Sequence, residues 1–171
     1  MSPEGNGAAR ARPIRSVLEL LRARIDHDEF DAALFSLEAV VADLGYGDLR
    51  PLIGSLAWID RLREEGKSIG LVYRGESAQA ALEIAGIADR FDVVGSGPAS
   101  EATLRAALGD LGVAPERTVL VATTPEALTA ARDAGFYLPI AVARGASSPE
   151  ALRHGGAALV VADLQELLGP T

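Results

Sequence analysis

The alternation of apolar runs with helical stripes along the chain predicts an α/β fold. Short apolar runs suited to buried strands alternate with segments of about 10–15 residues whose apolar positions recur at helical spacing. The predicted strands are 31–37, 68–73, 91–94, 118–122, 138–143 and 157–161. The predicted helices begin near Pro51, Ser77, Ser100, Thr124, Ser148 and Asp163. This order indicates a single Rossmann-like three-layer α/β/α domain with a mainly parallel sheet.

Two segments precede the predicted core domain, which we place at 29–171. Residues 1–12 are rich in Gly, Ala and Arg and predict a disordered tail. Residues 13–28 carry apolar side chains at helical spacing and predict an N-terminal amphipathic helix. This helix would either pack on the sheet or serve as a docking or dimerisation surface.

Composition excludes several classes of function. The chain has 171 residues and a net charge of −8, which argues against binding nucleic acid through its phosphates. It has no cysteine, which excludes disulfides and zinc–thiolate sites. No apolar stretch reaches the roughly 18 residues of a spanning helix, and the N-terminus lacks a signal-peptide pattern. We therefore expect a cytoplasmic protein that binds neither membrane nor nucleic acid.

Several segments, in this order, resemble the haloacid dehalogenase superfamily, most closely its β-phosphoglucomutase and sugar-phosphate phosphatase branch. From Phe35 to Asp43 the chain reads Phe-Ser-Leu-Glu-Ala-Val-Val-Ala-Asp, where that branch reads Phe-Asp-Leu-Asp-Gly-Val-Val-x-Asp. The later similar segments are 80–94, 111–121, 130–136 and 155–164. The resemblance covers roughly residues 30 to 168 and implies the α/β core of that superfamily.

The resemblance also implies a catalytic set that this sequence lacks. Members use an aspartate nucleophile, a second aspartate as general acid and base, a Ser or Thr and a Lys for the phosphate, and acids that complete a magnesium site. The corresponding positions here hold Ser36, Glu38, Tyr73, Gly97, and the pair Ala122 and Thr123. We therefore expect no catalytic residues, no metal ligands and no cofactor, the magnesium site of the family being lost.

The helical cap that this branch inserts after the first strand is also missing, because only about ten residues separate Val40 from Pro51. The main hypothesis is a catalytically inactive, capless relative that acts as a protein-interaction, scaffold or regulatory module. Its partner would be another protein or a second copy, bound through helix 13–28, the uncapped face or an exposed Trp58. Partial burial of Trp58 is the alternative.

Two other functions stay open. The chain could bind a phosphate ester or sugar phosphate without turnover, or it could be a weak phosphatase or hydrolase of the haloacid dehalogenase type, in which Glu38 would act on water. The candidate ligand-binding residues are Ser36, Glu38, Arg74, Thr123 and Thr124.

Overall fold

A parallel sheet forms the centre of the molecule in the computed structural model, which describes residues 25–75 and 77–168. Its six strands lie in the order β5-β4-β1-β6-β7-β8, and every neighbouring pair is parallel. The strands are β1 (Ala32–Ser36), β4 (Ser68–Tyr73), β5 (Val93–Ser96), β6 (Thr118–Ala122), β7 (Leu138–Val142) and β8 (Leu159–Val161). The predicted Rossmann-like α/β fold is confirmed.

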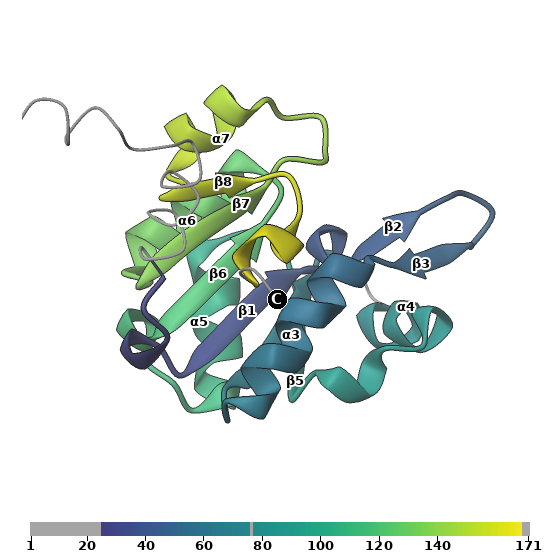
Figure 1. The fold of residues 1–171 in the computed structure, drawn as a ribbon, viewed down its shortest axis with the longest axis horizontal. Helices are drawn as coiled ribbons and strands as arrows, with labels where there is room; N and C mark the ends of the chain where they lie inside the picture. Colours follow the sequence, from purple (N-terminus) through teal and green to yellow (C-terminus); the bar gives the residue numbers. More distant parts are fainter. Residues whose placement is uncertain (1–24, 76, 169–171) are drawn as a thin grey trace, which may run out of the picture.

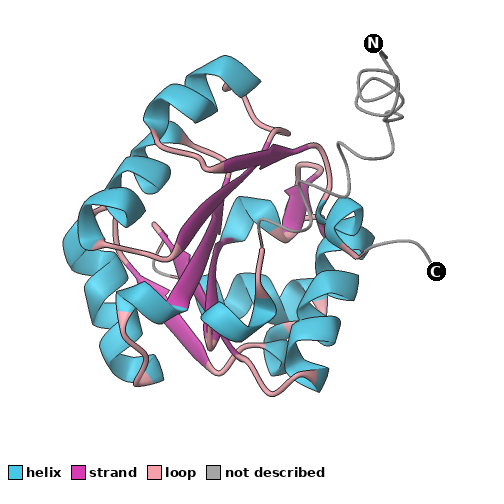
Figure 2. Cartoon of the chain, turned by 60° about the vertical axis from the view of Figure 1, so that its left-hand side comes forward, coloured by secondary structure: helices cyan, strands magenta, loops and turns pink. Residues whose placement is uncertain are grey.

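Helices cover both faces of this sheet (Figures 1 and 2). One face carries α3 (Ile53–Glu64), α4 (Ala78–Ala85) and the 3-10 helix η5 (Leu164–Leu167). The other carries α5 (Glu101–Leu111), α6 (Pro125–Ala134) and α7 (Pro149–Gly155). The starts of the last three follow from local chemistry, because the hydroxyls of Ser100, Thr124 and Ser148 each accept a backbone N–H of the first turn.

The core corrects the prediction for Trp58. Its side chain is fully buried on α3 and meets the ring of Phe35 on β1 edge to face, with ring centroids 6.0 Å apart. It is therefore neither half-exposed nor an interface anchor. The segment around η5 covers this part of α3, and a Cβ added at Gly54 would lie 2.0 Å from the carboxylate of Asp163.

A β-hairpin occupies the segment that the sequence analysis treated only as a connection to the first core helix. Strands β2 (Val41–Asp43) and β3 (Leu49–Pro51) pair antiparallel and project from the body, as Figure 1 shows. The turn between them contains Tyr46 at φ 54° between two glycines of positive φ. Within the described chain, residues 37–52 between β1 and α3 thus form a 3-10 turn, η2 (Leu37–Ala39), and this hairpin.

Smaller differences concern the ends of elements. β5 lies at 93–96 instead of 91–94, because residues 88–90 form a 3-10 turn, η3 (Ala88–Arg90), that Phe91 ends. The last predicted helix is the 3-10 helix η5, held by a capping box of Asp163 and Glu166. Most of the predicted tail and helix lies outside the described residues. Residues 25–28 are not α-helical, and the 3-10 turn η1 (His27–Glu29) precedes β1.

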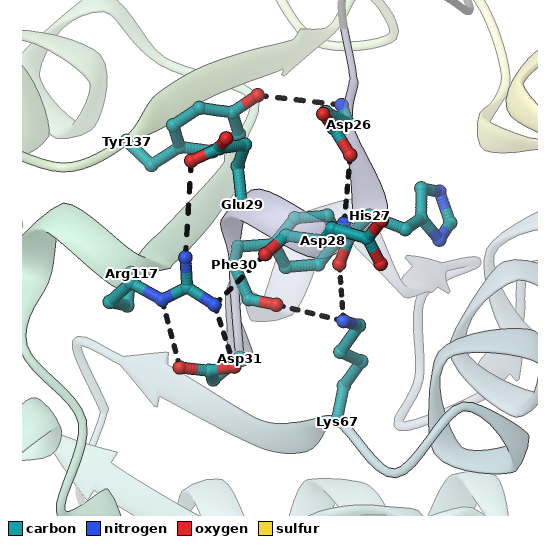
Figure 3. A network of polar contacts seen from close by, with 9 residues as sticks. All are labelled: Asp26, His27, Asp28, Glu29, Phe30, Asp31, Lys67, Arg117 and Tyr137. Atoms are coloured by element: carbon teal, nitrogen blue, oxygen red, sulfur yellow. Dashed lines mark hydrogen bonds and ion pairs between the residues drawn. The ribbon is translucent and has the colours of Figure 1, made fainter.

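Charged side chains at the amino ends of the strands make contacts with each other and with nearby backbone carbonyls. We call these residues the amino-edge cluster: Asp28, Phe30, Asp31, Lys67 and Arg117 (Figure 3). The Arg117 guanidinium donates to both carboxylate oxygens of Asp31, at 2.9 and 3.0 Å, and to the carbonyl of Asp28 at 3.0 Å. The hydrogen bond from Arg117 lowers the pKa of Asp31. Lys67 donates to the carbonyls of His27 and Phe30.

The strand order places a topological switch point between β1 and β6. The chain runs outward from β1 to β4 and β5, returns to β6 on the other side of β1, and continues to β7 and β8. In open α/β sheets, ligands bind outside the carboxyl ends of the strands at such a point. The functional groups of this chain are therefore sought at the carboxyl ends of β1, β4 and β6.

Candidate functional site

A cavity of about 410 Å³ lies at the carboxyl ends of β1, β4 and β6, and we call it the Arg74 pocket. Ser36 ends β1, Glu38 stands on η2, and Arg74 follows β4. Thr123 and Thr124 connect β6 to α6. All five side chains predicted to bind a ligand line this one cavity. The structure thus brings the whole candidate set together.

The remaining positions of the altered catalytic set separate into two groups. Tyr73 and Gly97 also line the Arg74 pocket. Ala122 is fully buried in β6 and is not among the residues that line the cavity. The ring of Tyr73 folds back over Gly75, where an added Cβ would lie 2.5 Å from the ring. The substitutions therefore leave the cavity open, because the tyrosine ring lies along its wall.

Arg74 is a cation without a carboxylate partner among the residues that the structure describes. Nearly all the other described arginines lie within 4.0 Å of a carboxylate: Arg50, Arg61, Arg63, Arg90, Arg105, Arg117 and Arg132. Only Arg144 and Arg153 share with Arg74 the lack of such a contact in this part of the chain. An unpaired guanidinium at the mouth of a cavity is suited to an anion.

Two hydroxyls at the base of the site also lack partners within the described residues. The Oγ atom of Ser36 is buried and makes no hydrogen bond. Thr123 is 5% exposed, and its hydroxyl accepts and donates no hydrogen bond there. By contrast, the buried hydroxyls of Ser55 and Thr118 both donate to carbonyls. Because buried polar groups are generally hydrogen-bonded, the buried Ser36 hydroxyl calls for a partner from outside the chain, and the unpaired Thr123 hydroxyl is available in the same cavity.

The first turn of α6 and the segment that leads into α5 line the same cavity. Pro98 and Ala99, just before α5, and Glu126 and Ala127, at the start of α6, all line the Arg74 pocket. A helix N-terminus carries about half a positive charge, which favours an anion. Sequence reasoning named Thr124 as a candidate ligand-binding residue but treated Glu126 only as part of a helix start, and so missed that Glu126 lines the site. The acidic residue in the first helical turn after β6 was the available signal.

A second hollow of about 430 Å³, the Arg144 pocket, shares a wall with the first. Glu38, Tyr73, Thr123 and Thr124 line both. The remaining lining combines polar groups with apolar faces from the hairpin: Asp43, Arg144, Ser147, Leu37, Val41 and Leu49. Sequence reasoning missed Arg144, because it follows β7 in a loop without a recognised motif. The two hollows form one extended site with an anion-attracting end.

The magnesium ion that the family resemblance implies does not fit the residues present. Magnesium takes near-octahedral oxygen ligands, including carboxylates. The only carboxylates lining the Arg74 pocket among the described residues are Glu38 and Glu126. In residues 25–75 and 77–168, no group of three or more His, Cys, Asp or Glu side chains could hold a metal. Ser36, which the resemblance aligns with the nucleophile of the family, offers a neutral hydroxyl.

Comparisons with known proteins agree on the fold. No protein-family model matches the chain. A trehalose-phosphate phosphatase of Mycobacterium leprae is 34% identical over 149 residues, which are 84% of this chain but 33% of that protein. This chain therefore spans about a third of the length of the relative. No helix among the described residues is long and apolar enough to cross a membrane.

Solved structures with the same fold are numerous at low identity. A haloacid dehalogenase family hydrolase of Deinococcus radiodurans, with bound phosphate and sodium, superposes with a TM-score of 0.71 at 17% identity, over 81% of this chain and 93% of that one. A β-phosphoglucomutase of Clostridium difficile gives 0.60 at 20% identity, over 68% and 52% of the two chains. The chain has the haloacid dehalogenase core fold, and the predicted resemblance is confirmed.

These findings correct the main functional prediction. The sequence predicted a catalytically inactive module that acts through protein contacts. The similar proteins named above are a phosphatase, a hydrolase and a phosphoglucomutase, which point to phosphate-ester chemistry instead of an inactive scaffold. The physical reason for the error lies in the cavity. Loss of the aspartates was taken to abolish the site, but the cavity remains open and keeps an unpaired cation and free hydroxyls.

Proposed function

We propose that this chain binds phosphate monoesters, with sugar phosphates as the substrate class, in the Arg74 pocket and hydrolyses them slowly. The observation that carries the proposal is the gathering of Ser36, Glu38, Arg74 and Thr123 around one cavity at the switch point of the sheet. The Arg74 guanidinium and the hydroxyls of Ser36 and Thr123 line the same cavity as the Glu38 carboxylate, which could accept and donate a proton. This combination suits a phosphoryl group and an attacking water.

The relative from Mycobacterium leprae supports the choice of ester. It is a trehalose-phosphate phosphatase, so its substrate joins a phosphate to a sugar. Because this chain spans about a third of that protein, the activity of the whole relative carries over only as a proposal. The two hollows give it a physical basis: one end offers a cation, and the other offers hydrogen-bonding groups beside apolar faces.

The hydrolytic step needs one group of the chain to move a proton. A water molecule attacks the phosphorus, and the Glu38 carboxylate takes a proton from it. A bond forms between the water oxygen and phosphorus while the phosphorus–oxygen bond to the alcohol breaks. The proton then passes to the leaving alkoxide, so that the products are an alcohol and inorganic phosphate. Without a carboxylate nucleophile that forms a covalent phospho-enzyme this route is slow, and Glu38 supplies the proton transfer.

The alcohol part of the ester would lie in the Arg144 pocket. Asp43, Arg144 and Ser147 provide acceptors and donors for hydroxyl groups. Leu37 and Val41 provide apolar surface for the C–H faces of a sugar ring. Since residues 37–52 form a turn and a short hairpin where related enzymes carry a helical cap, we infer that the site stays open to large or extended alcohols.

The proposal is tested by phosphate release and binding measured side by side. Hydrolysis of p-nitrophenyl phosphate and glucose 6-phosphate is followed by product formation, and glucose 6-phosphate binding by calorimetry. Glu38→Gln keeps the shape of the side chain but removes the base, so we expect hydrolysis to fall on the order of 100-fold. Binding of glucose 6-phosphate is expected to persist or strengthen, because a negative charge leaves the site.

The control is Arg153→Ala, because Arg153 is exposed on α7, unpaired within the described chain and outside both pockets. It should leave hydrolysis and binding unchanged. Hydrolysis that is equal in wild type and Glu38→Gln would remove the assigned role of Glu38. Failure of wild type to bind any of these esters would overturn the proposed function as a whole.

A further inference from the structure

We propose that the Arg74 pocket recognises the phosphate group without a divalent cation, through the Arg74 guanidinium and the free hydroxyls of Ser36 and Thr123. This inference rests on the proposed function and specifies how its ligand is held. It departs from the family resemblance, in which magnesium supplies the positive charge. An unpaired cation, two free hydroxyls and few metal ligands lie together around this cavity in the described part of the chain.

The positive charge comes from Arg74. A guanidinium can donate two parallel hydrogen bonds to a phosphate, which a metal ion would otherwise hold by coordination. Within the described chain, no carboxylate competes for Arg74 by direct contact. The N-termini of α5 and α6 add partial positive charge at the same cavity. Glu38 and Glu126 oppose the anion, so we expect affinity on the order of 1 mM rather than tight binding.

The register of the sheet brings the two hydroxyls close to that charge. Phe35 of β1 lies opposite Val121 of β6, so the next residues, Ser36 and Ala122, also run side by side and Thr123 follows. On the other side, Ser36 is opposite Val72 of β4, two residues before Arg74. Three neighbouring strand ends therefore contribute one donor each to a single cavity.

The state of these hydroxyls points to a ligand. The Ser36 Oγ is buried without a hydrogen bond, and Thr123, at 5% exposure, lines both hollows with its hydroxyl unpaired in the described residues. A buried hydroxyl without a partner, such as that of Ser36, destabilises the chain until a ligand supplies a hydrogen bond. A phosphate oxygen would satisfy each of them after rotation about the side-chain bond. A hydroxyl donates to an anion equally well whether or not a metal is present.

The test is calorimetric titration of inorganic phosphate and glucose 6-phosphate into the full chain, once with EDTA and once with excess Mg²⁺. We expect the same affinity in both conditions. Arg74→Ala should weaken binding by about 10- to 100-fold, and Arg74→Lys by less, because lysine keeps the charge without the two-pronged geometry. Ser36→Ala and Thr123→Val should each weaken binding by about 2- to 10-fold.

Circular dichroism establishes that each variant is folded, and Arg153→Ala serves as the matched loss of an unpaired arginine. Binding in Mg²⁺ that EDTA abolishes would overturn this inference while leaving the proposed function intact. Binding in both conditions that Arg74→Ala does not weaken would also overturn it. Absence of binding in every condition would instead refute the proposed function, so the two failures are distinguishable.

Discussion

The two edges of the central sheet differ in whether their charged groups have partners within the chain. At the amino edge, Arg117 is bound to Asp31 by two hydrogen bonds and Lys67 donates to backbone carbonyls. At the carboxyl edge, Arg74 and the hydroxyls of Ser36 and Thr123 have no partners among the described residues. The charged groups at the amino edge of the sheet thus satisfy each other, whereas Arg74, Ser36 and Thr123 at the carboxyl edge have no partner among the described residues.

This difference indicates what each edge does. Contacts that are complete within the chain can only hold its segments together, so the amino-edge cluster ties η1 to the starts of β1, β4 and β6. Groups that are incomplete can bind something else, and they lie where α/β sheets place ligands. The comparison predicts that changes at the amino edge affect stability alone, and that changes at the carboxyl edge affect binding more than stability.

The largest effect is expected at the amino edge, from Phe30→Ala. Phe30 is fully buried, its ring stacks on that of Tyr137 with centroids 6.2 Å apart, and the Lys67 Nζ lies 4.9 Å from the ring centroid. Removing the ring should lower the free energy of unfolding by about 3–5 kcal/mol. Denaturant unfolding measures this loss, and calorimetry at low temperature should show unchanged phosphate affinity for the folded variant.

Leu44→Ala in the hairpin is the control, because Leu44 is 61% exposed and should change stability by less than about 0.5 kcal/mol. If Phe30→Ala weakened phosphate binding tenfold under conditions where it is fully folded, the two edges would be coupled. The separation drawn between them would then be wrong.

A smaller, two-sided effect is expected at the carboxyl edge from Glu126→Gln. Glu126 lines the Arg74 pocket and stands in the first turn of α6. Loss of its charge should strengthen phosphate binding, by a factor of about 2–5, since like charges no longer meet there. It should also destabilise the chain by about 0.3–1 kcal/mol, because an acid favours a helix N-terminus.

The chain offers a matched control for that substitution. Glu150 follows Ser148 and Pro149 at the start of α7, as Glu126 follows Thr124 and Pro125, but it lines neither pocket. Glu150→Gln should cost similar stability and leave phosphate affinity unchanged. Equal gains in affinity from both variants would show that the effect comes from net charge and not from the pocket.

The sequence predicted the elements whose signals are local. Strands β4 and β6 lie where the apolar runs placed them, and α6 begins at the predicted cap and proline. The hairpin was missed because its pairing depends on a turn in which Tyr46 takes a positive φ. The burial of Trp58 depends on the packing of α3 against β1, where its ring meets that of Phe35, and this contact joins segments distant in sequence.

For the candidate site, the convergence of parallel strand ends let five pocket residues be predicted from separate segments. Arg144 and Glu126 were missed, because each borders the site only through the shape of a neighbouring loop or helix turn. The sequence also could not predict that Arg74 would lack a carboxylate partner. Whether an arginine meets a carboxylate depends on side chains brought together from distant segments, as the contact between Arg117 and Asp31 illustrates.

The smallest effect concerns the pH dependence of the amino edge. The hydrogen bond from Arg117 lowers the pKa of Asp31 in the folded chain below its ordinary value. A carboxylate with a lowered folded pKa stabilises the fold above its unfolded pKa, about 3.9. That contribution is lost as the pH falls through the folded pKa. Asp31→Asn should therefore lower the Tm between pH 5 and pH 8, and the difference from wild type should shrink below about pH 4.

Thermal unfolding of both proteins across this range measures the difference. Asp110→Asn is the control, because Asp110 has no ion pair with the described residues and its replacement should give no pH-dependent difference. A Tm difference for Asp31→Asn that stays constant down to pH 3 would mean that the ion pair with Arg117 does not stabilise the fold. The amino-edge cluster would then hold the strand ends through the contacts of Lys67 and Phe30 alone.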